Sequence, residues 1–329
     1  MKKNDRVTII MAVYNAAGFL HDSIESLMKQ TYKEIEIICV DDGSTDGSKA
    51  IIENYARQDA RIRLLSLEKN SGAAVARNKA VEVMTGDLVA FLDADDWMEE
   101  RAIEAAVKVF DDNPQTDTVL FTCIMQRPDG KQYPYPQEAF CRKSGYDAFV
   151  DSLTWTIHGI YMARASLYRQ YPYDTTCRTF SDDNTTRLHY YISREVRTCE
   201  GKYFYRYNPD GISHNNTVSR LDYLRASEAM RRHLSHLSVS DDVLRLYERQ
   251  HWLIIIDAYM FYYRNRSHFS LADQIYCLSE IKSAWRGVNI SFLPFGLKWK
   301  FGYMPLRFSW SLFRCQEECY FFFKSFLIQ

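Results

Sequence analysis

Acidic side chains follow two apolar segments of the chain, at the points where each segment ends. Asp41 and Asp42 come directly after the apolar run 35–40, and the acidic run 93–96 comes directly after 88–92. Because the carboxyl ends of parallel strands meet at one edge of a sheet, these carboxylates would share one crevice. Bringing them together is costly unless a cation or a donor-rich ligand lies there. The pattern therefore predicts a site for a metal-bound, phosphate-containing ligand.

The segments that must position these acids alternate between strand-like and helix-like patterns. Apolar runs typical of buried strands lie at 7–13, 35–40, 62–67 and 88–92. Between them, apolar residues recur at helical spacing. Strands that alternate with helices of this length predict right-handed parallel units in a three-layer α/β sandwich. After about residue 100 the order loosens into short strands and loops, and from about Leu221 the pattern predicts long helices.

Composition narrows the class of protein. The chain has 329 residues, of which 47% are hydrophobic and 25% charged, as in ordinary globular proteins. A net charge of −1 gives no basic field for a nucleic acid. Eight cysteines without a C-x-x-C pair are typical of buried thiols in a reducing compartment. The N-terminus does not resemble a secretory signal, and the longest apolar stretch, 252–263, is below the ~20 residues that span a bilayer. We therefore expect a cytoplasmic location, with peripheral attachment to the inner face of the membrane left open.

The first hundred residues contain four motifs, in this order: AVYN at 12–15, VDDGSTDGS at 40–48, SGAAVARN at 71–78 and FLDADD at 91–96. In this order and spacing they resemble the inverting family 2 glycosyltransferases of the bacterial cell-surface polysaccharide type, which have a GT-A fold. One departure is Ala12, which stands where the family often has proline. That position acts through its backbone, so we expect little effect.

The resemblance implies a GT-A three-layer α/β/α sandwich with a mostly parallel central sheet and a helical C-terminal extension. We expect a catalytic domain at 1–215, with a nucleotide-sugar half at 1–100 and an acceptor half at 101–215. The extension would occupy 216–329. The implied activity is the metal-dependent, inverting transfer of a sugar from a UDP-sugar to a glycan or lipid-linked acceptor.

The resemblance also implies a metal site in the motif at 91–96. Asp95 would bind Mg²⁺ or Mn²⁺ directly, and Asp93 would reach the ribose or the metal. Hard carboxylate oxygens suit both ions, which neutralise a departing diphosphate. His214 is a further candidate for the metal or the diphosphate, although a lone histidine is more often structural. The alternative for the acids themselves is a capped turn at the start of a helix.

The predicted nucleotide-sugar site comprises Ala12, Tyr14, Asn15, Asp41, Asp42, Gly72, Arg77, Asp93, Ala94 and Asp95. Asp42 is our first choice to accept the imide N–H of uracil, and Asp41 could instead hold the loop. Tyr14 would cover the base or the ribose. Gly72 would let the backbone approach the ligand, and Arg77 could pair with phosphate or with the acids. A plain turn with an N-cap and a surface arginine are the structural alternatives.

The acceptor half of the site rests on fewer residues. The inverting reaction needs one general base on the acceptor hydroxyl. In the family this is an aspartate of a downstream acidic pair, which implies Asp183 as the base and Asp182 as its neighbour or an acceptor contact. A helix N-cap is the alternative. Trp155 and His158 lie where the family builds the floor of the sugar pocket, although a tryptophan is more often part of the core.

The C-terminal segment 296–329 holds eleven aromatic residues and five lysines or arginines against two glutamates. This mixture suits a membrane–water interface. A helical cap on the catalytic domain, or contact with a second copy in a homodimer, explains it equally well. The sequence leaves these alternatives open.

Other functions fit the motifs less well. A non-catalytic sugar-binding or scaffold protein would not need intact Asp93, Asp95 and Asp183. An aspartyl phosphotransferase would have its D-x-D motif after the first strand and without the Asp96-Trp97 pair that follows here. A sugar nucleotidyltransferase would carry a glycine-rich basic loop after the first strand, where this chain reads MAVYNAAGFL.

Overall fold

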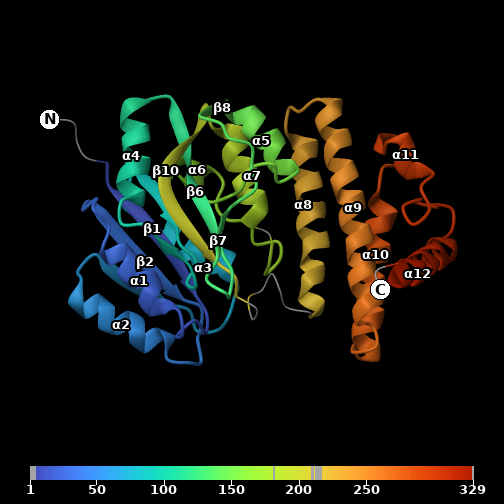
Figure 1. Cartoon of the computed structure of the whole chain (residues 1–329), viewed down its shortest axis with the longest axis horizontal. Coiled ribbons are helices and arrows are strands. Elements are labelled where there is room, and N and C mark those ends of the chain that lie inside the picture. The colour runs from blue at the N-terminus through green and yellow to red at the C-terminus, as the bar shows by residue number, and fades with distance from the viewer. Residues whose placement is uncertain (1–4, 181, 209–210, 212–216, 328–329) are drawn as a thin grey trace. The chain divides into compact units, whose positions relative to one another are not determined.

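The computed structural model describes residues 5–180, 182–208, 211 and 217–327 (Figure 1). The chain divides into two compact units, 1–214 and 215–329. The first contains a ten-stranded sheet, and the second is helical. Among the described residues, no helix is both long enough and apolar enough to cross a membrane.

The sheet of the first unit has the strand order β3-β2-β1-β4-β9-β6-β10-β5, with β7 paired to β6 and β8 paired to β10. Its strands are β1 (Val7–Val13), β2 (Ile35–Asp41), β3 (Ile62–Ser66), β4 (Leu88–Phe91), β5 (Trp97–Met98), β6 (Thr116–Gln126), β7 (Gln132–Pro134), β8 (Arg142–Ser144), β9 (Tyr161–Arg164) and β10 (Glu195–Arg206). Strands β1 to β4 are mutually parallel, β9 is antiparallel to both its neighbours, and β6 and β10 are parallel to each other. The sheet is therefore mostly parallel, as predicted.

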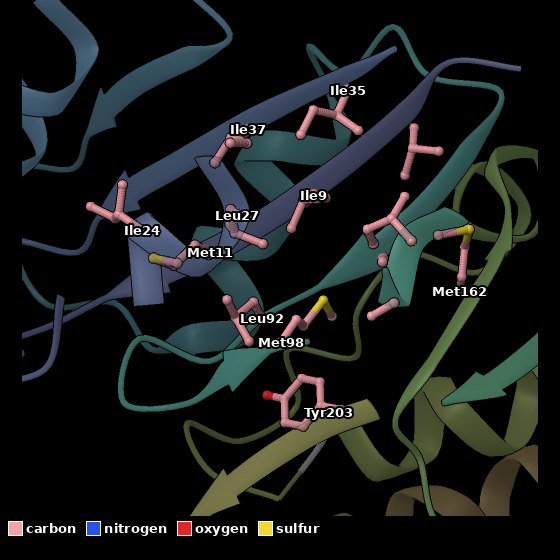
Figure 2. Close-up of a cluster of buried hydrophobic side chains, with 14 of the residues drawn as sticks. Ile9, Met11, Ile24, Leu27, Ile35, Ile37, Leu92, Met98, Met162 and Tyr203 are labelled. Atoms are coloured by element: carbon pink, nitrogen blue, oxygen red, sulfur yellow. The ribbon is translucent and has the colours of Figure 1, made fainter. Parts of the chain in front are cut away.

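Helices cover both faces of this sheet. They are α1 (Leu20–Met28), α2 (Ser48–Gln58), α3 (Ala73–Val81), α4 (Ala102–Asp112), α5 (Gly145–Leu153), α6 (Ala165–Gln170) and α7 (Asp182–Ile192). On one face α1, α2 and α4 bury their apolar stripes against alternate strand residues. Figure 2 shows Leu27 of α1 beside Ile9 of β1. On the other face α3 packs on β1 and β2, and His189 of α7 packs on Tyr161 of β9. These layers form the three-layer α/β/α sandwich of a GT-A fold.

The second half of the sheet differs from the sequence expectation in one strand. The sequence predicted only short strands after about residue 100, but β10 is continuous over twelve residues and its register against β6 shifts between Thr198 and Lys202. Gly201 lies at this irregularity. A Cβ atom there would lie 2.6 Å from the carbonyl oxygen of Ala102, so only glycine allows the strand to approach α4 so closely.

The second unit consists of helices packed around an aromatic core. They are α8 (Asp222–His236), α9 (Asp241–Asn265), α10 (Leu271–Gly287), α11 (Phe295–Lys298) and α12 (Trp310–Leu327), with 3₁₀ turns η2 (Val218–Leu221) and η3 (Ile290–Phe292). Ser240 and Ser270 cap α9 and α10, because each hydroxyl accepts a backbone N–H of the first turn. Trp252, Tyr259 and Phe313 are fully buried and in ring contact.

Candidate active site at the carboxyl edge of the sheet

The acidic loop after β4 is held in place from β10. The backbone N–H of Asp93 donates to the hydroxyl of Tyr203 over 3.1 Å, and this hydroxyl donates to Asp96 over 2.8 Å. Asp96 also accepts the backbone N–H of Arg206 over 2.8 Å. Burial raises the pKa of Asp96 well above its usual range, and the charges of Asp93 and Asp95 raise it further. Asp96 is therefore a buried anchor for the loop.

The other two acids of this loop remain accessible. Ala94 is buried between them, and its carbonyl accepts the hydroxyl of Ser23 over 2.8 Å. Asp95 is half-buried, and one of its oxygens accepts the side-chain amide of Asn208 over 3.0 Å. The side chain of Asp93 is 35% exposed. Asp93 and Asp95 thus present carboxylate oxygens at the edge of the sheet where the sequence predicted them.

Arg77 of α3 joins this loop to the acidic pair of α7. Its buried guanidinium donates to Asp93 over 2.6 Å and to Asp182 over 2.8 Å. The group lies 5.0 Å from the ring centre of Phe91 and 5.3 Å from that of Tyr173. Burial lowers the pKa of Arg77, but the two carboxylates outweigh it and the net change is upward. Arg77 is therefore a fixed positive charge between both halves of the site.

The net charge around Arg77 remains negative. Burial raises the pKa of Asp93; Arg77 lowers it, and the charges of Asp95 and Asp182 raise it again, so that the net direction is upward. A single guanidinium thus compensates the local carboxylates only in part. A cation or a donor-rich ligand at this edge would stabilise their ionised forms.

Asp182 and Asp183 form the first turn of α7, where carboxylates interact favourably with the helix dipole. Asp182 is engaged by Arg77, whereas Asp183 interacts with Arg187 one turn later on the same helix. Burial raises the pKa of Asp183 to about 7, with Arg187 lowering it and Asp182 raising it. The two neighbouring acids therefore differ in their environment.

Trp155 contacts Arg187, the residue that interacts with Asp183. The guanidinium of Arg187 lies 4.8 Å from the centre of the Trp155 ring, and Trp155 adopts a positive φ of 57°. Such a backbone conformation is uncommon for a bulky residue and marks a constrained position. The structure thus brings Trp155 towards the acidic pair and leaves it half-buried.

His158 does not line this region as the sequence predicted. The side chain is only 4% exposed, its Nδ1 accepts the backbone N–H of Ile160, and its ring meets that of Tyr135 edge-on. Burial lowers its pKa to about 4. A neutral, buried imidazole cannot contact an acceptor directly, so His158 belongs to the core, the more frequent place for a lone histidine.

The end of β1 presents two residues of the predicted nucleotide-sugar site. Tyr14 is 47% exposed. Asn15 adopts a positive φ of 49°, and its side-chain oxygen accepts the backbone N–H of Thr45 over 2.8 Å. Ala12 is half-buried in β1, paired with Val40 of β2. Asn15 therefore fixes the turn after β1, while the ring of Tyr14 is accessible to a ligand.

Asp42 holds the loop before α3, a role that the sequence analysis offered to Asp41. Its two oxygens accept the backbone N–H groups of Ser71 and Gly72 over 2.7 and 2.8 Å. Asp41 accepts the N–H of Ser44 over a longer 3.3 Å. Both aspartates are buried. A carboxylate has about four acceptor positions, so contact of Asp42 with a base stays a prediction beside this structural role.

Glycine is required at two positions around this loop. Gly72 has a φ of +98°, and a Cβ atom there would lie 3.2 Å from the carbonyl oxygen of Arg178. Gly43 has a φ of +71°, and its Cβ would lie 2.7 Å from the backbone of Lys69. Residues with side chains rarely adopt this conformation. Both glycines permit the close backbone approach that shapes the crevice.

Three residues of the site carried no role in the sequence prediction. Tyr203 is separated from Asp93 by 110 residues, so no local pattern links them. Tyr173 reaches Arg77 from a loop, and that loop is tied to α3 by two reciprocal 2.8 Å hydrogen bonds with Asn78. Arg187 could have been found, because it follows Asp183 by four residues on one helix.

The side chains available to bind a metal ion bear on the predicted metal site. His214 lies outside the described residues. Within the part of the chain that the structure describes, no three His, Cys, Asp or Glu side chains are arranged to hold an ion. Mg²⁺ and related ions are usually bound by one or two carboxylates together with substrate phosphates, rather than by a complete protein cage. The accessible oxygens of Asp93 and Asp95 fit that mode.

The family model for "Glycosyl transferase family 2" matches residues 8–177, which include the acidic loop, Arg77 and Trp155. The chain belongs to glycosyl transferase family 2. Among curated proteins that this chain resembles, glycosyltransferase GlyA of Streptococcus pneumoniae is 41% identical over 108 residues. These residues make up 33% of this chain and 15% of GlyA, so the chain matches only a small part of that relative.

Two solved structures have a similar fold. S. aureus TarS 1–349 in complex with UDP-GlcNAc aligns with a TM-score of 0.76 at 18% identity, over 96% of this chain and 91% of that one. The mannosyltransferase PcManGT from Pyrobaculum calidifontis, in complex with GDP-Man and Mn²⁺, aligns with a TM-score of 0.57 at 18% identity, over 88% and 83%. At these identities the likeness establishes the GT-A fold.

Proposed function

We propose that this chain is an inverting, metal-dependent glycosyltransferase that uses a UDP-sugar. The observation that carries the proposal is the bridge from Asp93 through Arg77 to Asp182, because it brings the acids of both predicted half-sites into one cluster. A scaffold protein would not need a buried arginine between carboxylates that are themselves accessible. Family membership supports transfer of a glycosyl group.

In the proposed reaction, Asp183 accepts the proton of the acceptor hydroxyl. The oxygen of that hydroxyl forms a bond to the anomeric carbon as the bond from this carbon to the β-phosphate oxygen breaks, and UDP departs with the electron pair. Attack from the face opposite the leaving group inverts the anomeric centre in one step. No covalent intermediate with the enzyme forms.

The contrast between the two acids of α7 supports Asp183 as the base. A pKa of about 7 matches the working pH, where a base is both ionised and strong enough to accept a proton. One carboxylate oxygen of Asp182 is already engaged by the Arg77 guanidinium over 2.8 Å, which leaves it less free to accept a proton from an acceptor. We therefore give Asp182 the role of holding the start of α7 beside the donor half.

Asp95 and Asp93 would hold the divalent ion, which when bound neutralises negative charge on the departing diphosphate. Tyr14 would stack on the uracil or ribose, in a contact worth about 1–3 kcal/mol by analogy with base stacking. The donors named for the two similar structures are UDP-GlcNAc and GDP-Man. The sequence resemblance implies a UDP-sugar, and the acceptors of Asp42 and Asp41 are compatible with the imide N–H of uracil, so we favour UDP.

The proposed acceptor is a hydroxyl of a glycan or lipid-linked glycan of the cell surface. Trp155 supports a sugar acceptor, because an aromatic face suits the C–H face of a pyranose and the ring lies beside Arg187, which interacts with Asp183. A location in the cytoplasm follows as part of the same proposal, since nucleotide-sugars are made there.

A thermal-shift panel tests the donor assignment. The chain is melted with UDP-, GDP- and TDP-sugars, each with and without Mn²⁺. A donor at about 100 times its Kd stabilises the folded state by about 2.7 kcal/mol, which raises the Tm by several degrees. We expect stabilisation by UDP-sugars with Mn²⁺ that is lost in Asp95→Asn. A preference for GDP or TDP compounds would overturn the base assignment.

A further inference from the structure

Helix α12 exposes an apolar stripe in addition to the apolar side chains that it buries in the core of the second unit. Its solvent-facing stripe consists of Leu312, Cys315, Cys319, Phe322 and Phe323, all exposed. These residues recur at the three- and four-residue spacing of one helix face. The inward face buries Phe313 and Phe321 together with the polar side chains of Gln316 and Glu317.

A second exposed apolar group precedes α12. Phe295 and Trp299 are 78% and 68% exposed and lie in ring contact with centroids 6.3 Å apart. Phe301, two residues further, contacts Tyr320 of α12 edge-on at 5.9 Å. Tyr320 precedes Phe323 by three residues on the helix. Ring contacts therefore connect the segment at 295–301 with α12. We call the exposed residues of both parts the aromatic surface: Phe295, Trp299, Phe301, Leu312, Cys315, Cys319, Phe322 and Phe323.

Positive charges border the aromatic surface. Lys298 and Lys300 flank Trp299, and Lys324 lies over the ring of Tyr320. Residues 290–316 contain no Asp or Glu. Among the described residues, no carboxylate is within 4.0 Å of the ammonium group of Lys298, Lys300 or Lys324. These lysines therefore add a positive field that no paired acid cancels locally.

We propose that the aromatic surface binds the headgroup region of an anionic phospholipid bilayer. Aromatic rings favour this interface, where their apolar bodies leave water, and neighbouring lysines are attracted by anionic lipids. An exposed apolar face of this extent marks an interaction site rather than an ordinary protein surface. The proposal stands apart from the chemistry proposed for Asp183.

The charge distribution favours a bilayer over a second copy of the chain. A two-fold dimer places the same patch of each copy against the other. Here each copy would bring Lys298, Lys300 and Lys324 without acids to meet them, and like charges across an interface are unfavourable. An anionic bilayer supplies the missing negative charge.

Vesicle sedimentation with the full chain tests the proposal. One set of vesicles is phosphatidylcholine alone, and the other contains equal parts of phosphatidylcholine and phosphatidylglycerol. We expect binding to the mixed vesicles that weakens as salt rises. The variant Phe322→Ser/Phe323→Ser, and separately Lys298→Glu/Lys300→Glu, should bind about tenfold or more weakly. The control Leu271→Ser/Ile275→Ser, which removes exposed apolar residues of α10, should bind like the wild type.

Each other outcome overturns the proposal. Equal binding of the wild type to both vesicle types would remove the role of anionic lipid. Undiminished binding in both surface variants, with melting curves like that of the wild type, would exclude the aromatic surface. A change of the phenylalanine variant from dimer to monomer in analytical ultracentrifugation, without loss of vesicle binding, would identify a second copy as the occupant.

Discussion

The guanidinium of Arg77 donates a 2.8 Å hydrogen bond to Asp182, across 105 residues of chain. The other end of the same group donates to Asp93 in the loop after β4. A buried cation held between two partly exposed carboxylates fixes the distance between the two half-sites. The acids that suggested a metal site in the sequence and those that suggested a general base therefore belong to one cluster.

Replacement of Arg77 tests this bridge. Lysine keeps the charge but not the planar fork that reaches two carboxylates, so we expect Arg77→Lys to lower kcat/KM by about 10²-fold through misplacement of the acids. Arg77→Met should also lower the free energy of unfolding, by about 2–3 kcal/mol, because the carboxylates keep their charge without a partner. Lys79→Met, exposed on the same helix, is the matched control. Unchanged activity in both Arg77 variants would show that the bridge does not position the site.

Asp182 and Asp183 are expected to have different roles, so their replacement should have different effects. Asp183→Asn should lower kcat for transfer by about 10²–10⁴-fold while leaving the affinity for the donor unchanged, because only the base is removed. Asp182→Asn should act more weakly on kcat and should lower the Tm, because it removes one partner of buried Arg77. Transfer kinetics and donor titrations of the two variants check this. A larger loss of kcat in Asp182→Asn would reverse the assignment.

The pH dependence follows from Asp183. Its pKa is raised to about 7, so the ionised, active form is lost as pH falls through 7 and gained as pH rises. We expect kcat/KM to rise with pH up to a plateau above 7. The charge of Arg187 lowers the pKa of Asp183. Arg187→Gln removes that charge and should therefore shift the rise of kcat/KM to higher pH. A profile that does not move in this variant would argue against Asp183 as the titrating group.

Replacement of Asp42 should affect both the stability of the fold and the binding of the sugar donor. Asparagine has one acceptor oxygen in place of two, so Asp42→Asn leaves Ser71 or Gly72 without its partner. We expect a loss of about 1–3 kcal/mol in the free energy of unfolding, together with weaker donor binding. Asp41 accepts a longer hydrogen bond, from the backbone N–H of Ser44, so Asp41→Asn should cost less. Denaturant unfolding of both variants measures the difference.

The second unit carries an acid whose titration should appear in stability. Glu317 is fully buried, and burial raises its pKa to about 8. The folded state thus holds a proton that the unfolded state releases near its ordinary pKa of 4.5, so stability falls as pH rises from 4.5 to 8. Glu317→Gln should flatten that slope and stabilise the chain at pH 8 by about 1–3 kcal/mol. Melting curves across this range test it, and an unaltered slope would contradict it.

The sequence predicted the parts of the fold whose signal is local. The apolar runs before Asp41 and Asp93 correctly gave strands, and their order gave a mostly parallel sheet. Strand β9, only four residues long and antiparallel, lies in a segment that showed no clear period. The loop-holding role of Asp42 and the role of Tyr203 could not be predicted, because their partners are 29 and 110 residues away. Contacts of this kind become visible only once the layers are assembled.

The misplacement of His158 has a different cause. Its position in the chain suited a pocket, but a histidine between apolar residues fits the core equally well. The structure resolves the ambiguity by burial, with the imidazole against Tyr135. Trp155, only three residues earlier, lies half-buried beside Arg187, so one segment contributes to both the core and the edge of the site.

The release of UDP from a UDP-sugar with Mn²⁺ tests the central claim most directly, because it needs no known acceptor. The wild type, Asp95→Asn and Asp183→Asn are compared at several pH values, each with and without the metal. We expect metal-dependent release by the wild type that rises through pH 7, together with strong losses in both variants. Release that needs neither metal nor Asp183, or no release and no metal-dependent UDP binding, would contradict it.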